Sequence, residues 1–193
     1  MQAFQPLSGL ESLQETIMLN AIEVILICLV AQAALTDLAM RKIPNVLILS
    51  GLLLALILHL LSGPPWAPLS HWLAGTMAGF FLFLPLYLLR GMAAGDVKLM
   101  AMVGAFLGPW AALQIAVVSS LMGGVIALLM LLVTGRWRQI WRNLVQICQP
   151  LLLRLSGVPL LPVPLEPAAS VGGIPYGVAI ACGTVSVVVL NHC

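Results

Sequence analysis

The sequence contains few charged residues: Asp, Glu, Lys and Arg together occupy only 7% of its 193 positions. Hydrophobic residues make up 62% of the chain, and the mean hydropathy is +1.12. A soluble domain of this length has no core large enough to bury so much apolar surface. The composition therefore excludes a soluble protein and predicts an all-α polytopic membrane protein that uses lipid as its solvent.

Basic residues are absent from the first seventeen positions, which carry Glu11 and Glu15 instead. A cleaved secretory signal begins with a basic segment, so we expect the first apolar segment to be a retained anchor. The chain also lacks a CxxC pair, and no His lies near its cysteines at ligand spacing, so we expect neither a zinc site nor a disulfide framework. We expect no other metal and no cofactor. The four cysteines are Cys28, Cys148, Cys182 and Cys193.

Long apolar runs divide the chain into segments that suit a hydrocarbon core about 30 Å thick. The fourth run has only 11 residues before the sequence GPW interrupts it, so a helix there covers about 16 Å and cannot cross alone. We therefore expect residues 91–95 to enter the membrane and place Asp96 within it. The six predicted spans are Met18–Thr36, Ile43–Leu61, His71–Leu89, Val97–Leu107, Trp110–Thr134 and Gly172–Leu190.

The basic residues predict the orientation of these spans, because positive charge is enriched in cytoplasmic connections. With six spans, all eight Lys and Arg fall in, or at the edge of, the three connections on one side of the membrane, with Lys98 as the second residue of the fourth span. That side is predicted to be cytoplasmic, with the N-terminus and the C-terminus outside and the three histidines on the outer side. The basic residues are Arg41, Lys42, Arg90, Lys98, Arg136, Arg138, Arg142 and Arg154.

We predict a single membrane-embedded domain over residues 1–193, with residues 1–17 as an extracytoplasmic N-terminal segment. Residues 135–171 form the longest connection. Its first part has aromatic and apolar residues on one helical face and basic residues on the other, which is typical of an amphipathic helix lying on an anionic leaflet. The rest is rich in proline and predicts an extended cytoplasmic loop. Close helix contacts are expected at Gly75 with Gly79 and at Gly123 with Gly124.

Two of the six acidic residues, Asp37 and Asp96, fall at the predicted cytoplasmic ends of their spans. Ionisable groups at membrane depth are costly and are usually functional. Two structural interpretations remain open: Asp37 could pair with Arg41, one helical turn away, and Asp96 could cap the fourth helix. The alternative is one joint site. Two carboxyl groups close together in a dry site share a proton, so that one activates water while the other polarises a carbonyl, as in aspartic peptide hydrolysis.

Two sequence blocks give a specific resemblance. The stretch TDLAMRKIPN resembles the D-x-x-x-R-x-I-P-N block of the type IV prepilin peptidases, and AAGDVKLM resembles their G-x-G-D-x-K block, shared with wider intramembrane aspartic proteases. The stretch GGIPYGVAIACG is similar to a weaker C-terminal block. The resemblance implies that Asp37 and Asp96 are the catalytic pair. It further implies supporting or substrate-binding roles for Gly95, Lys98, Arg41, Pro44, Asn45, Pro175, Tyr176 and Gly177.

Physical reasons accompany some of these supporting positions. Pro44 suits the first residue of the second span, and Gly95 suits a tight turn before Asp96. For Arg41 and Lys98 two roles stay open, which are catalytic influence on the aspartates and anchoring at membrane depth. The first glycine of the family's second block is replaced by Ala93 in this chain.

The resemblance implies an intramembrane aspartic endopeptidase of the bacterial inner membrane, which cleaves the leader of type IV prepilin-like proteins at the cytoplasmic boundary. Residues 38–42 leave no room for the CxxC domain associated with N-methylation, so the chain resembles the peptidase-only form of tight-adherence (Flp) pilus systems. Expected partners are the prepilin, the lipid bilayer and pilus or secretion assembly machinery, without nucleic acid. The alternatives are a proton-coupled transporter and a non-catalytic pilus-assembly scaffold.

Overall fold

The computed structural model describes residues 6–61, 66–89, 91–134 and 176–192. The chain divides into two compact units, of which one comprises Met1–Gly123 with Pro175–Cys193 and the other Gly124–Ile174. The described residues of the second unit are the end of one helix. The first unit contains the other helices and all the packing discussed below.

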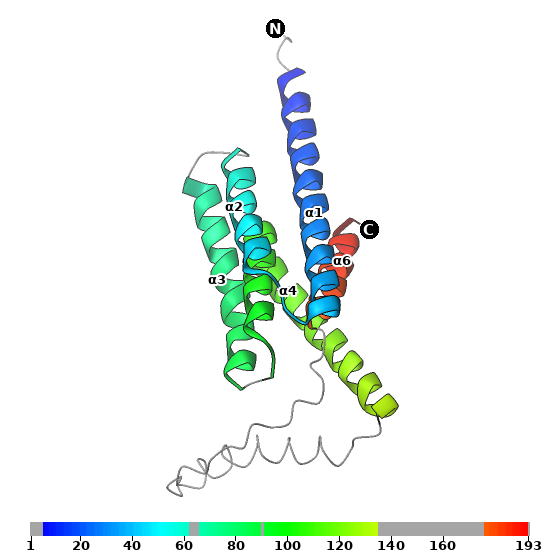
Figure 1. The fold of residues 1–193 in the computed structure, drawn as a ribbon. Helices are drawn as coiled ribbons and strands as arrows, with labels where there is room; N and C mark the ends of the chain where they lie inside the picture. The colour runs from blue at the N-terminus through cyan, green and yellow to red at the C-terminus, as the bar shows by residue number, and fades with distance from the viewer. Residues whose placement is uncertain (1–5, 62–65, 90, 135–175, 193) are drawn as a thin grey trace, which may run out of the picture. The chain divides into compact units, whose positions relative to one another are not determined.

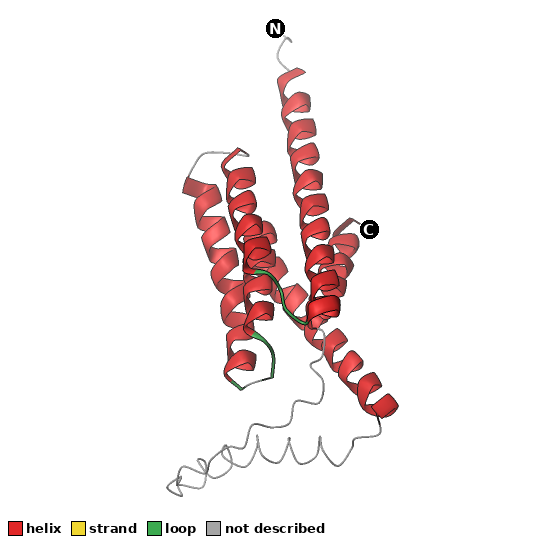
Figure 2. Cartoon of the chain, in the orientation of Figure 1, coloured by secondary structure: helices red, strands yellow, loops and turns green. Residues whose placement is uncertain are grey.

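The described part of the chain is helical and contains no strand (Figures 1 and 2). In the first unit, α1 packs against α2 and α6, and α2 packs against α3. The helices are α1 (Pro6–Met40), α2 (Asn45–Leu61), α3 (Trp66–Leu88), α4 (Ala94–Thr134) and α6 (Tyr176–His192).

Three of the described helices are long and apolar enough to cross a membrane, within Ala21–Met40, Leu69–Leu88 and Ala94–Met130. The helices α2 and α6 are apolar but shorter. The all-helical prediction is therefore confirmed for the described residues, whereas the six spans and the orientation of the termini stay predictions. The predicted amphipathic helix and proline-rich loop of residues 135–171 lie outside the described residues.

Helix α1 begins at Pro6. It therefore includes most of residues 1–17, which were predicted to precede the first span. Helix α4 joins the predicted fourth and fifth spans in one element with a break at Gly108, where φ is 84° and ψ is 178°. A β-carbon built on Gly104 would lie 3.3 Å from Ala112 Cβ, although eight residues of straight helix rise about 12 Å. The chain therefore turns back at Gly108 and Pro109, which agrees with the predicted interruption at GPW.

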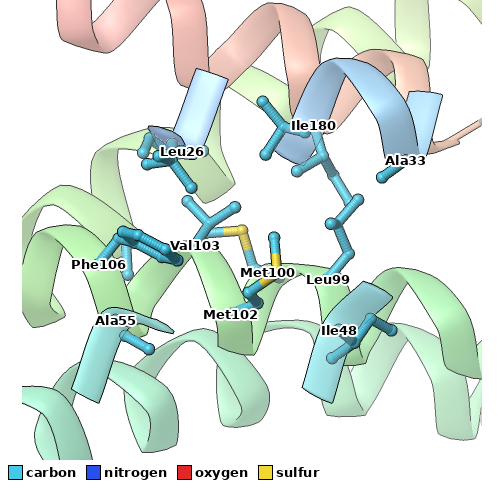
Figure 3. Packing of buried hydrophobic residues seen from close by; sticks show 14 of the residues in the cluster. Leu26, Ala33, Ile48, Ala55, Leu99, Met100, Met102, Val103, Phe106 and Ile180 are labelled. Atoms are coloured by element: carbon cyan, nitrogen blue, oxygen red, sulfur yellow. The ribbon is translucent and has the colours of Figure 1, made fainter. Parts of the chain in front are cut away.

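Residues 95–108 of α4 form the centre of the first unit. Almost every side chain from Asp96 to Phe106 is buried, on all sides of the helix rather than on one stripe. A helix that is apolar all round needs neighbours on every face. Figure 3 shows these neighbours around Met100 and Val103: Leu26 and Ala33 from α1, Ile48 and Ala55 from α2, and Ile180 from α6.

Glycines allow α3 and α4 to approach through their backbones. A β-carbon on Gly75 would overlap the carbonyl group of Gly104, one on Gly104 would overlap that of Gly75, and one on Gly79 would overlap that of Met100. The predicted close approach at Gly75 and Gly79 is thus confirmed. At Gly123 the neighbour is the ring of Tyr176, and at Gly124 no atom of the described residues lies within 4 Å of a built β-carbon.

The outer faces of the helices expose large apolar side chains. Val46, Leu35 and Leu121 are 78%, 67% and 67% exposed. Exposed apolar surface on this scale is unfavourable in water and ordinary in lipid. The packing of the described residues therefore fits a membrane protein, as the composition predicts.

The backbone contact between α3 and α4 predicts a contrast between two identical substitutions. Gly104→Ala forces a methyl group against the Gly75 carbonyl, so we expect it to destabilise the protein by about 1–3 kcal/mol. Gly124→Ala, in the same helix but in open space, should be neutral or slightly stabilising, because Ala favours helix over Gly. Thermal unfolding of both variants in detergent measures the difference, and equal midpoints would contradict the close packing.

Candidate active site

The two aspartates singled out in the sequence are the buried charged residues of the described chain. Asp37 lies in the last turn of α1 and is 8% exposed, and Asp96 lies in the first turn of α4 and is 4% exposed. Neither carboxyl group is therefore a surface group that faces water freely. A buried carboxyl group requires hydrogen-bond partners, and each aspartate has one from the backbone.

The carboxyl group of Asp37 is held by the N-terminus of α6. The backbone N–H of Gly177 donates to Asp37 Oδ2 at 2.8 Å in a buried position. Gly177 is the second residue of α6, so its N–H has no acceptor within that helix. The partial positive charge at a helix N-terminus also favours an anionic partner. The end of α6 therefore supplies both a donor and a favourable field to Asp37.

Gly177 has no side chain where Asp37 comes closest. A β-carbon on Gly177 would lie 2.8 Å from Asp37 Oδ2 and 2.9 Å from Asp37 Cβ, closer than real β-carbons approach such atoms. Any larger residue would displace the carboxyl group from the end of α6. The resemblance gives roles to two glycines, Gly95 and Gly177. Of these, Gly177 is the one at which the structure leaves no space for a side chain.

Arg41 contacts Asp37 through the backbone. Its N–H donates to the Asp37 carbonyl group at 2.8 Å, and its φ of 51° ends α1 in the left-handed conformation. The Arg41 side chain is exposed. The structural interpretation in which Asp37 serves as an ion-pair partner of Arg41 is thus not supported, since the recorded hydrogen bond of the carboxyl group goes to Gly177.

Asp96 caps its own helix. Its Oδ2 accepts a hydrogen bond of 3.1 Å from the N–H of Ala93, and its own N–H donates to the Ala93 carbonyl group at 3.1 Å. The bond from Ala93 N–H to the carboxyl group is the one that an acidic residue at the third helical position makes in a capping box. The capping interpretation is therefore confirmed. It fixes the carboxyl group in place and engages one of its two oxygens.

The bundle places the two carboxyl groups, from distant parts of the sequence, within electrostatic range of each other. Asp37 and Asp96 are close enough for their charges to repel each other. Asp96 also interacts electrostatically with Tyr176, the first residue of α6, whose ring packs against Gly123 of α4. The ends of α1, α4 and α6 thus converge on one polar site within an apolar bundle.

Lys98 and Asn45 form a separate pair beside this site. Lys98 Nζ donates to Asn45 Oδ1 at 3.0 Å, joining α4 to the first residue of α2. Residues two apart on a helix do not share a face, so exposed Lys98 and buried Asp96 point in different directions. The pair lies at a groove of about 380 Å³ that is otherwise mainly apolar, lined by Asn45, Ile48, Leu49, Leu52, Thr76, Phe80, Lys98 and Ala101.

The remaining predicted residues have structural positions. Pro44 precedes the first residue of α2, and its carbonyl group accepts from Leu47 N–H, so it is an N-cap residue rather than the first helical residue. Gly95 is helical, so the tight turn predicted there is wrong, and a β-carbon would lie at an ordinary 3.5 Å from Ile43 Cβ. Pro175 lies outside the described residues.

Sequence reasoning missed the backbone groups that hold the aspartates. A donor such as Ala93 N–H is independent of residue type and leaves no signal in the sequence. The only available signal was positional: GIPYG precedes an apolar run and marks a helix N-terminus, where free N–H groups gather.

Comparison with known proteins identifies a family. A sequence profile described as the type IV leader peptidase family matches residues 24–128, which include both aspartates and more than half of the chain. Curated proteins and solved structures give no significant match. The matched region contains α2, α3 and the Asp37 and Asp96 ends of α1 and α4. The chain therefore belongs to the type IV leader peptidase family.

Proposed function

We propose that this protein is an intramembrane aspartic endopeptidase that removes the leader from type IV prepilin-like proteins. The observation that carries the proposal is the pair of buried carboxyl groups, Asp37 and Asp96, brought within electrostatic range by different helices. Membership of a leader peptidase family supports the substrate class. Neither a structural ion pair nor capping alone gives a reason for both acids to converge.

The two carboxyl groups have complementary roles in the proposed reaction. Because two adjacent anions are unfavourable, the pair holds one proton. The ionised carboxylate accepts a proton from water as the water oxygen attacks the scissile carbonyl carbon, while the protonated carboxyl group donates to the carbonyl oxygen. Transfer of a proton to the amide nitrogen then releases the mature protein. Both aspartates exchange acid and base roles during one turnover, so their proton belongs to the pair.

The surroundings favour this chemistry in two ways. The helix ends that hold Asp37 and Asp96 fix both carboxyl groups without using a positively charged side chain, which would neutralise the shared-proton pair. Both carboxyl groups are also buried, so hydrogen bonds to the developing charge are stronger there than in bulk solvent. The protein scaffold itself thus supplies the orientation that the reaction needs.

The proposed location of the site is the cytoplasmic boundary of the inner membrane. Seven of the eight basic residues fall in connections on one side of the six-span arrangement, and the eighth, Lys98, lies at the start of the fourth span on that same side. Arg41, Lys42 and Lys98 lie close in sequence to the aspartates. A prepilin presents its leader in the cytoplasm and its apolar helix in the bilayer. The scissile bond at that junction meets a site at the same depth.

Replacing either aspartate tests the proposal. Asp37→Asn and Asp96→Asn keep the shape of the side chain and remove the shared proton, so each should lower prepilin cleavage by at least about 10²–10⁴-fold. Cleavage is followed by mass mapping of a candidate prepilin incubated with purified protein. Unchanged membrane insertion and helical circular dichroism serve as the control. Cleavage that survives both substitutions contradicts a peptidase that uses this pair and favours a scaffold or a transporter.

The contact between Gly177 and Asp37 generates a second prediction. In Gly177→Ala the added methyl group displaces the carboxyl group, and a displacement of about 1 Å costs up to about 100-fold in rate. The cleavage rate should therefore fall strongly while the protein stays folded. Gly124→Ala introduces the same methyl group into open space and should cleave like the unmodified chain. Equal rates for the two variants would remove Gly177 from the site.

The position of Lys98 favours anchoring over catalytic influence on the aspartates. Because its ammonium group binds Asn45 rather than an aspartate, we expect Lys98→Met to lower the cleavage rate by less than about 10-fold. Its effect should appear mainly in thermal stability or membrane insertion, as an anchoring residue requires. A loss of cleavage as complete as that of Asp96→Asn, with the helices intact, would assign Lys98 a catalytic role instead.

A further inference from the structure

The reversal of α4 leaves backbone carbonyl groups without helical partners. The helix of residues 94–107 ends at Gly108, and the last four carbonyl groups of a helix have no N–H to accept from within it. Pro109 follows at once and has no N–H at all. In an apolar region these carbonyl groups need donors from another element.

His59 of α2 supplies one such donor. Its Nε2 atom lies 3.0 Å from the carbonyl oxygen of Ala105, in the last turn before the break. A carbonyl oxygen only accepts hydrogen bonds, so Nε2 carries the proton in this contact. His59 is half-buried and is the third-last residue of α2. An imidazole donor at a helix C-terminus also interacts favourably with the helix dipole.

His71 of α3 packs against the same turn. Its ring meets the ring of His59 edge-on, with centroids 5.4 Å apart and planes at 67°. It also lies directly against Gly108, where a β-carbon would overlap His71 Nε2. Position 108 thus requires glycine for two reasons: a side chain would overlap His71, and a φ of 84° is unfavourable for other residues. The reversal is held between α2 and α3.

The turn at Gly108 connects the part of α4 that carries Asp96 to the part that packs against α6, the helix that holds Asp37. Residues 94–107 carry Asp96 at their far end. After the turn, Gly123 contacts Tyr176, and Ser119 lies where a β-carbon on Gly183 of α6 would overlap it. Helix α6 in turn holds Asp37 through Gly177. The angle and register of the two parts of α4 therefore set where Asp96 lies relative to Asp37.

We infer that His59 is a positioning residue for the aspartate pair, acting from the opposite end of the bundle through its hydrogen bond to Ala105. The catalytic part of this inference rests on the proposed function, whereas the contact itself does not. His59 touches neither aspartate. It holds the C-terminal end of the helix that carries Asp96, and loss of the donor lets the two parts of α4 shift against each other.

Two substitutions of His59 separate a hydrogen bond from mere packing. His59→Leu fills similar space without a donor, and His59→Gln places an amide N–H near the position of Nε2. Ser50→Ala is the matched control, because it also removes a side-chain donor to a backbone carbonyl group from α2, but within that helix. Hydrogen–deuterium exchange of the full chain in detergent reports the contact, and prepilin cleavage kinetics report the positioning.

In His59→Leu we expect faster exchange in peptides covering residues 105–113 and a fall in unfolding midpoint of about 2–4 °C. We also expect kcat to fall about 10- to 100-fold with KM nearly unchanged, well below the unfolding midpoint. His59→Gln should recover most of the exchange protection, of the unfolding midpoint and of kcat. Ser50→Ala should change neither exchange at residues 105–113 nor kcat.

Each other result overturns a defined part of the inference. Unchanged exchange at residues 105–113 in His59→Leu overturns the contact. Faster exchange with an unchanged kcat overturns the positioning role. A full loss in His59→Gln as well shows that the donor is not the feature that matters and overturns the hydrogen-bond mechanism. If the unmodified protein cleaves no prepilin, the proposed function fails and the positioning role with it, while the exchange comparison still decides the contact.

Discussion

One hydrogen bond determines the arrangement of the site: the N–H of Gly177 donating to the carboxyl group of Asp37 across 140 residues of sequence. It fastens the C-terminal end of α1 to the N-terminal end of α6. In an apolar bundle a buried carboxyl group without a donor would be costly, so this contact fixes which end of α6 faces the aspartates. The proximity of Asp96, on a third helix, then follows from how α4 packs against α1 and α6.

Helix α4 packs against both the centre of the bundle and α6 because it turns back on itself at Gly108. Its first part is buried on every side and carries Asp96 at its start, whereas its second part returns to pack against α6. Close backbone contacts at Gly75 and Gly104 hold the first part against α3. Glycine here serves packing rather than flexibility, because neighbouring helices in lipid gain stability from close approach instead of from the expulsion of water.

The sequence alone predicted the helical class and a chain that suits a membrane, and it singled out the two aspartates that the structure buries, for physical reasons. The chain has only six acidic residues, so an acid within or beside an apolar run is easy to identify in the sequence. In a soluble protein, Asp37 and Asp96 would be two among many surface acids. The interruption at Gly108 and Pro109 was also readable, since both residues disfavour a continuing helix. The family assignment is confirmed by the match over residues 24–128.

The remaining features depend on contacts that residue type does not encode. The donors from Gly177 and Ala93 are backbone groups, and the contacts of Lys98 with Asn45 and of His59 with Ala105 join residues 53 and 46 positions apart. Such pairs depend on helix register, which composition and periodicity leave open. The tight turn at Gly95 was wrong for a related reason: the motif suggested a loop, whereas the chain is already helical from Ala94.

The central claim is that the side chains of Asp37 and Asp96 face each other in the folded protein. The most direct measurement replaces both by cysteine, in a chain whose four native cysteines are removed, and treats native membranes with a short thiol-to-thiol cross-linker. We predict rapid internal cross-linking of the double variant and none of either single variant. Two cysteines that each react with a small thiol reagent yet never cross-link to each other would contradict it.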